Sequence, residues 1–110
     1  MELSNHDEVV AAIHARREVA VTFRSKEDGG MVLERRCAPM DFAPGTRARD
    51  KTPRYHFWDF ESDSGKTHPL SLLADQIIDV QVLESTFNPE EFVSWETSWT
   101  IARSTWGSAN

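Results

Sequence analysis

The residues best suited to chemistry gather in the middle of the chain. Between Glu34 and Arg54 six basic side chains stand against three acidic ones, a net charge of +3. The stretch RYHFWDF (residues 54–60) follows at once and places four aromatic rings and a histidine in seven positions. Cations beside stacking rings are typical of sites that bind nucleotides and single strands. The candidate ligand-binding residues are Arg35, Arg36, Arg47, Arg49, Lys51, Arg54, Tyr55, His56 and Trp58.

The charge balance limits what that segment can bind. The whole chain carries −6, so the residues outside 34–54 carry −9. This acidic remainder repels a long polyanion, whose affinity depends on many phosphate contacts. A small anionic ligand is repelled less by this negative charge than a long strand is. A nucleotide-sized ligand is therefore favoured over nucleic acid. The alternative is a solvent-exposed basic loop with no binding role.

Catalytic and metal-binding arrangements are weak by comparison. His56 and His68 could be neighbours on adjacent strands, with Asp59 or Asp63 as a third ligand, but this spacing matches no metal signature. We expect no metal and no cofactor, and His56 as a hydrogen-bonded residue that could donate to an anion. Cys37 is expected to be a small buried filler. With no nucleophile motif or phosphate-binding glycine loop, the sequence predicts a non-enzymatic protein.

The surrounding pattern predicts one helix, about five strands and a short C-terminal helix. SNHDEVVAAIHARRE predicts a helix capped by Ser4 or Asn5. VAVTFRS and MVLERRC predict a hairpin closed at KEDGG, with Val19, Val21 and Phe23 on one face. Residues 38–53 are expected to form a long loop. Later strands are expected at 54–60, 67–72 and 77–85, the last with Ile78, Val80 and Val82 on one face.

Residues 54–60 alternate so that Tyr55, Phe57 and Asp59 share one face, and His56, Trp58 and Phe60 share the other. Neither face is polar throughout, so this strand should be covered on both sides or belong to a barrel. Five short strands joined by hairpins predict a mainly β protein, a small β-barrel rather than an open sheet.

The tryptophan-rich C-terminal tail (residues 93–110) is ambiguous between helix and strand. Asn88 and Pro89 predict the start of a short helix over 89–95, followed by extended chain. Three tryptophans within twelve residues are too apolar to stay in water, so they should dock on the barrel or on another subunit. Trp95, Trp99 and Trp106 are therefore candidate interface residues, and a homo-oligomer is expected.

The order of parts resembles the WYL domain of bacterial regulators. AAIHARREVAVTFRS is similar to the family's opening helix and first strand. RYHFWDFESDSGKTHPLSLLADQIIDVQVLESTF is similar to its aromatic signature strand and the segment after it. The family's Trp-Tyr-Leu trio falls on Tyr55, His56 and Phe57. Its Leu-Asp-Arg-Ile stretch falls on residues 74–77, without the arginine, and a second family arginine falls on Leu73.

The resemblance covers about residues 8–92. It implies an Sm-like small β-barrel and a role in sensing a nucleic acid or nucleotide-like effector. Only about seven residues precede it, so we expect no DNA-binding helix-turn-helix ahead of the domain.

At 110 residues the chain is expected to be one domain, with no secretory signal and no membrane span. A single cysteine fits the cytoplasm. The leading interpretation is a regulatory domain that binds a small anionic ligand or a protein partner. The alternatives are an oligomeric interaction module without a ligand and a single-stranded nucleic-acid binder.

Overall fold

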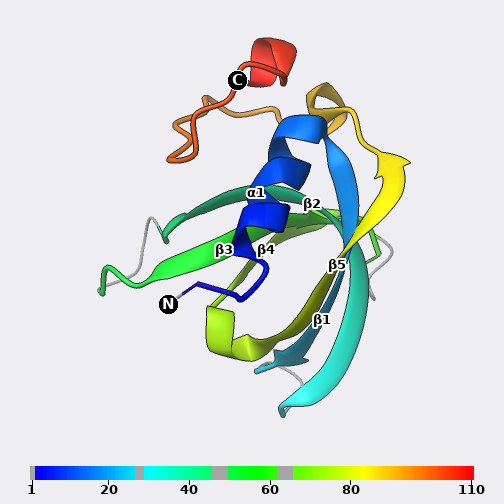
Figure 1. Cartoon of the computed structure of the whole chain (residues 1–110), viewed down its shortest axis with the longest axis vertical. Coiled ribbons are helices and arrows are strands. Elements are labelled where there is room, and N and C mark those ends of the chain that lie inside the picture. The colour runs from blue at the N-terminus through cyan, green and yellow to red at the C-terminus, as the bar shows by residue number, and fades with distance from the viewer. Residues whose placement is uncertain (1, 27–28, 46–49, 62–65) are drawn as a thin grey trace.

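The computed structural model describes residues 2–26, 29–45, 50–61 and 66–110. A helix and five antiparallel strands in one sheet form a mainly β fold (Figure 1). Their bounds are α1 His6–Ala15, β1 Arg17–Ser25, β2 Met31–Pro44, β3 Pro53–Asp59, β4 His68–Leu72 and β5 Ile77–Thr86. Three single-turn 3₁₀ helices are η1 Ala74–Gln76, η2 Pro89–Glu91 and η3 Gly107–Ala109.

Helix α1 forms where the sequence predicts it and buries Val9, Ala12 and Ile13. Its cap works differently from the prediction. Asn5 holds the N-cap position, but its side-chain amide donates to the Val80 carbonyl (2.8 Å) and so ties the helix to β5. The helix ends at Arg16, whose left-handed backbone (φ 56°) turns the chain directly into β1.

The strand order is β4-β3-β2-β1-β5, so β4 and β5 are the two ends of the sheet. The predicted hairpin is confirmed: β1 and β2 pair from Val19–Cys37 to Ser25–Met31. Val19, Val21 and Phe23 are at most 4% exposed, on the face that α1 covers. Among the described residues β4 and β5 do not pair, so closure into a barrel stays a prediction.

The long loop predicted over residues 38–53 is wrong in its first half, because β2 continues to Pro44. Two prolines made this segment look like a loop. However, β1 pairs with β2 only as far as Cys37, and beyond that point β3 is the one strand partner of β2 among the described residues. Proline is tolerated where that side of a strand forms no ladder hydrogen bonds, because its missing N–H is not needed there. A register shift between Pro39 and Asp41 adds a local bend.

The predicted face of β5 is also wrong at one residue. Ile78 is 51% exposed, whereas Ile77 is 8% exposed and lies in the core. The pairing of β1 with β5 shifts register between Thr22–Asp79 and Phe23–Ile77. Ile78 is the extra residue of this bulge, and a bulge reverses the alternation on one side of itself.

Two apolar clusters lie on opposite sides of β3. The inner cluster lies beneath α1 and contains Tyr55 and Phe57. The outer cluster contains Phe87, Phe92 and Trp106, with Trp58 packed against it. The tail supplies much of this second cluster and lies beside the end of α1 (Figure 1, orange to red). β3 is thus covered on both faces, as its aromatic pattern predicts.

The predicted helix over 89–95 is only one turn long. Its start is confirmed, because the Asn88 side chain accepts the Glu90 amide (3.2 Å) and Pro89 takes the first position. Between Glu91 and Gly107 the chain forms neither helix nor strand. The tail therefore has to be held by side chains.

Candidate functional site

Asp41 fixes the tail to the sheet. Its Oδ2 accepts the Thr100 amide and its Oδ1 accepts the Ile101 amide, both at 2.9 Å. Asp41 is 8% exposed and follows the irregularity in β2 that turns it toward the tail. These bonds supply acceptors that a β-ladder would otherwise provide. Nothing in the sequence pattern distinguished Asp41 from the other acids.

Arg103 is the second fastening. Its side chain is fully buried, and its guanidinium lies 4.3 Å from the ring centres of both Trp99 and Trp106. Nε and Nη2 donate to the Ile101 carbonyl, and Nη2 lies 3.7 Å from Asp41 Oδ1. Burial lowers the pKa of Arg103 to about 10. This cation belongs to the tail's own packing.

The interface prediction for the tryptophans needs correction. Trp106 is 1% exposed, and its indole nitrogen donates to the Ile13 carbonyl at 2.7 Å, so it is a core residue. Trp99 is partly buried and donates to the Ala109 carbonyl at 2.8 Å. Only Trp95, 42% exposed, offers a large surface. The tail docks mainly on its own sheet, which was one of the two predicted outcomes.

A groove of about 970 Å³ runs between the sheet and the tail, and we name it the tail groove. One wall comes from β2, β3 and β4, and the other from tail residues around Trp95 and Trp99. Its lining residues are Met40, Asp41, Ala43, Pro44, Gly45, Arg54, His56, Trp58, Pro69, Ser71, Trp95, Glu96, Ser98, Trp99 and Thr100. The structure thus brings together three predicted ligand-binding residues: Arg54, His56 and Trp58.

The aromatic wall of this groove is layered. The Trp58 ring stacks against Phe92 (5.1 Å between ring centres, 19° between planes) and against Trp95 (5.9 Å, 26°). Trp95 meets Trp99 edge to face at 6.3 Å. The innermost rings join the outer cluster, and Trp95 presents the surface on which a planar molecule can stack.

His56 lines the groove but is held by its neighbours. Its Nε2 donates to the Ala43 carbonyl, and its Nδ1 pairs with the Ser71 hydroxyl, each at 2.8 Å. Both nitrogens are therefore engaged, one on β2 and one on β4. The predicted role of His56 as a donor to an anion is not supported by this geometry. His56 instead positions the strands that form the groove wall.

The two histidines considered as metal ligands do not lie opposite each other in the sheet. His56 pairs across the sheet with Ser71, whereas His68 lies opposite Asp59, with 3.8 Å between His68 Nε2 and Asp59 Oδ2. Within residues 2–26, 29–45, 50–61 and 66–110, no three His, Cys, Asp or Glu side chains are grouped as metal ligands. Asp63 lies outside the described residues.

Tyr55 is misassigned as a ligand-binding residue. It is 1% exposed and faces α1, on the side of β3 away from the tail groove. Its hydroxyl accepts the Leu3 amide (3.0 Å) and forms a hydrogen bond with His6 Nδ1 (2.7 Å). Burial raises the pKa of this phenol. A period-two pattern shows that adjacent residues face opposite ways, but it does not say which face holds a site.

The predicted basic cluster is divided in the structure. Arg35 lies 3.7 Å from Asp59, and Arg36 donates to Glu18 at 2.7 Å, both at the β1-paired part of β2. Arg54 lies opposite Ala43, near the other end of β2. Lys51 is exposed, and Arg47 and Arg49 lie outside the described residues. Arg54 is thus the one predicted cation among the described residues that line the tail groove.

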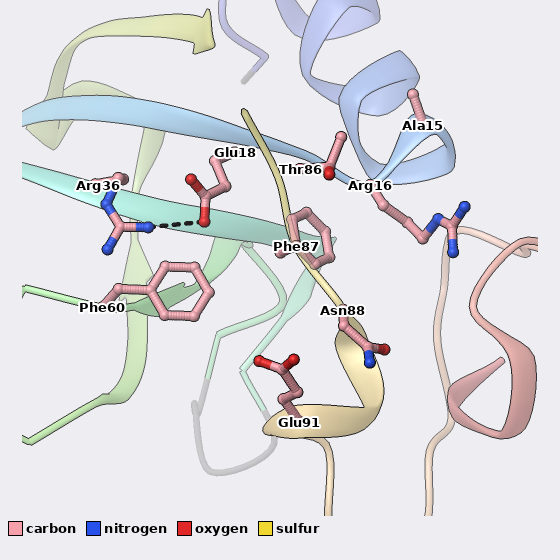
Figure 2. Close-up of a pocket in the computed structure, with 9 residues that line it drawn as sticks. All are labelled: Ala15, Arg16, Glu18, Arg36, Phe60, Thr86, Phe87, Asn88 and Glu91. Carbon is pink, nitrogen blue, oxygen red and sulfur yellow. Dashed lines mark hydrogen bonds and ion pairs between the residues drawn. The ribbon is translucent and has the colours of Figure 1, made fainter. Parts of the chain in front are cut away.

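A second groove of about 570 Å³ lies where α1 ends, and Figure 2 shows its lining. Arg36 faces Glu18 there and stands 5.0 Å from the centre of the Phe60 ring. Glu18 is 7% exposed, and its other oxygen accepts the Ser85 hydroxyl at 2.7 Å. In Figure 2 the Arg16 guanidinium points away from this pair. The pairing of Arg36 with Glu18 makes this groove a poor anion site.

Cys37 is fully buried between β1 and β3, in the inner cluster. Burial raises the pKa of its thiol, and the nearby Asp59 and Glu61 carboxylates add to the effect. A thiol in this state is a poor nucleophile.

Comparisons with protein-family models, with curated proteins and with solved structures found no match to this chain. None of the described helices has the length and apolar character required to cross a membrane.

Proposed function

We propose that this chain is a non-enzymatic regulatory domain, similar to WYL domains, which binds a small planar anion of nucleotide size in the tail groove. In this proposal the bent sheet is an Sm-like small barrel, and the fully buried Cys37 fits a reducing cytoplasm. The observation that carries the proposal is that Arg54 and the exposed Trp95 ring line the same groove.

The two ends of the proposed ligand contact different side chains in the groove. A flat ring stacks on Trp95, and a stack of this kind contributes roughly 1–3 kcal/mol. A phosphate or carboxylate pairs with the Arg54 guanidinium, whose fork matches such groups. A volume of about 970 Å³ is ample for a mononucleotide.

A polymer fits less well. Arg54 is accompanied in the groove by the acidic Glu96, and the chain as a whole carries −6. A single strand needs a row of cations along its backbone. Arg35 and Arg36, which would extend that row, are instead close to Asp59 and Glu18.

Tryptophan-fluorescence titration with adenosine, guanosine, cytidine and uridine monophosphates tests the proposal. Arg54→Gln should weaken binding about tenfold or more, because a charge-assisted hydrogen bond is lost. Trp95→Ala should weaken it by a similar factor. Arg24→Gln is the matched control, since this exposed arginine pairs with Val32 at the opposite end of β2.

Equal affinities in all three variants, or a flat trace with every nucleotide, would refute the proposal. Tighter binding to a mixed oligonucleotide, lost with salt, would favour the polymer.

A protein-interaction role is the second candidate, and exposed apolar residues away from the groove favour it. Val32 and Ile78 are 49% and 51% exposed, on strands either side of β1. Light scattering of Val32→Lys with Ile78→Lys tests whether these two exposed side chains help to join two copies. A mass that falls to that of one chain supports the role; an unchanged mass opposes it. Deleting the tail is no clean test, because the deletion removes Trp106 from the core.

A further inference from the structure

Two buried nitrogens lack a hydrogen-bond acceptor among the described residues: Trp58 Nε1 and Arg103 Nη1. Arg103 is otherwise well compensated, with two donors on the Ile101 carbonyl and the rings of Trp99 and Trp106 both beside its guanidinium. Trp58 has no such compensation, and its side chain lines the tail groove. A buried donor without an acceptor costs a fold free energy, so its retention calls for a reason.

The other interior tryptophans sharpen the contrast. Trp99 donates its indole proton to the Ala109 carbonyl at 2.8 Å, and Trp106 donates to the Ile13 carbonyl at 2.7 Å. Both of these protons are used to hold the tail. The Trp58 proton, in the wall between sheet and tail, is the interior indole proton left over within the described part of the chain.

We infer that Trp58 Nε1–H is the specificity donor of the tail groove, and that it selects a ligand ring carrying a hydrogen-bond acceptor on its edge. This inference rests on the proposed function. The ligand class is then an anionic nitrogen heterocycle, whose ring nitrogen or carbonyl oxygen takes the proton. A hydrocarbon ring with the same negative group lacks that acceptor and gains only the stacking and the charge.

Trp95 supplies the access. Trp58 Nε1 is enclosed, and Trp95 stacks on the Trp58 ring while remaining 42% exposed. Trp95 lies in the irregular tail, away from the Asp41 bonds at Thr100 and Ile101. In this proposal a shift of Trp95 uncovers the face of the Trp58 ring and lets a ligand reach its Nε1 edge, while the anchors and the sheet stay in place. The displaced ring then forms the stacking surface for the ligand.

Two probes of equal charge separate the donor from the rest of the groove. The tightest-binding nucleoside monophosphate carries ring acceptors, whereas 1-naphthyl phosphate carries none. In the wild-type protein, ¹H–¹⁵N spectra resolve the four indole protons, assigned with single Trp→Phe variants. Saturation with the nucleotide should move the Trp58 indole peak downfield and leave the Trp99 and Trp106 peaks, already hydrogen-bonded, nearly unmoved. Naphthyl phosphate should give no downfield shift at Trp58.

Trp58→Phe removes the N–H and keeps an aromatic ring. Its affinity for the nucleotide should fall roughly three- to tenfold, the value of one hydrogen bond, while its affinity for naphthyl phosphate stays unchanged. A Trp58 peak that stays in place at nucleotide saturation overturns the inference and leaves the proposed function standing; it requires no variant. Naphthyl phosphate binding as tightly as the nucleotide does the same. If neither probe binds, the proposed function fails and the inference fails with it.

Discussion

The two faces of β3 are buried in different ways. On the inner face, Tyr55 and Phe57 lie beneath a helix and within a continuous sheet, so regular elements satisfy most of the backbone around them. On the outer face, Trp58 is covered by Phe92 and a tail without regular structure. Both faces exclude water from aromatic rings. Only the outer face leaves a groove and an indole proton without a partner among the described residues.

The difference teaches what an irregular cover requires. A helix satisfies most of its amides internally and a strand pairs its amides with a neighbouring strand, whereas a coil must find acceptors one by one. Here Asp41 accepts two amides and Arg103 donates to the Ile101 carbonyl. A cover pinned at a few points fits less closely than a helix. A binding site is therefore expected on the outer face rather than the inner one.

The largest expected effect is on the inner face. Phe57 is fully buried, so Phe57→Ala should lower the free energy of unfolding by about 3–5 kcal/mol. Phe60→Ala, at a partly buried ring beside the outer cluster, should cost clearly less. Urea denaturation followed by circular dichroism measures both. Equal losses would break the distinction between the two faces.

The next effect concerns the fastening of the tail. Asp41→Ala leaves two amides without acceptors and removes the carboxylate near Arg103. We expect a loss of about 2–3 kcal/mol, because hydrogen bonds to a charged group are involved. Proteolysis should then cut the tail before the sheet. Asp79→Ala removes an exposed carboxylate on β5 and serves as the control; similar protection in both variants would contradict the anchoring role.

The alkaline dependence of stability should trace to the inner face. The pKa of Tyr55 is raised in the folded protein, so its contribution is complete below the unfolded value of about 10 and is lost as pH rises above it. The lowered pKa of Arg103 makes stability rise with pH in this range, which is the opposite effect. Arg103 is present in both the wild type and the Tyr55→Phe variant, so it does not affect the difference between them. Tyr55→Phe should cost about 1 kcal/mol at neutral pH and lose less stability than wild type above pH 10. Parallel urea curves at the two pH values test this, and equal slopes with pH would contradict it.

The smallest effect is a reaction that should not occur. Cys37 is fully buried and its thiol pKa is raised, so the native protein should not react with a thiol reagent at slightly alkaline pH. The same reagent in strong denaturant is the control and should react at once. Rapid labelling of the native protein would show that the inner face opens locally.

Local patterns predicted the fold well wherever a residue's environment depends on its near neighbours. Asn88 and Pro89 started a helical turn, and the alternation of β1 placed Val21 and Phe23 in the core. The patterns failed where a distant strand decides. Pro39 looked like a loop residue, yet it lies in β2, in the part of that strand that β1 no longer pairs.

The site was only partly predictable for the same reason. Arg54 and Trp58 were found because their residue types stood out in sequence, and the structure places both in one groove. Asp41 and Arg103 were missed, since an acid in a proline-rich stretch and an arginine among serines carry no local signal. Asp41 finds its partners, Thr100, Ile101 and Arg103, about sixty residues further along the chain. Tyr55 was misassigned because an aromatic ring reads the same on either face of a strand.

The distance in sequence between Trp58 and Trp106 also sets an order of events during synthesis. A ribosome adds about 5–20 residues per second, so the second ring is made some seconds after the first. Until then the outer face of the strand that carries Trp58 is only partly covered, although its inner face can already pack. We expect a nascent chain held at this stage to expose an aggregation-prone aromatic surface. Docking of the tail would then protect the protein against aggregation by covering that surface.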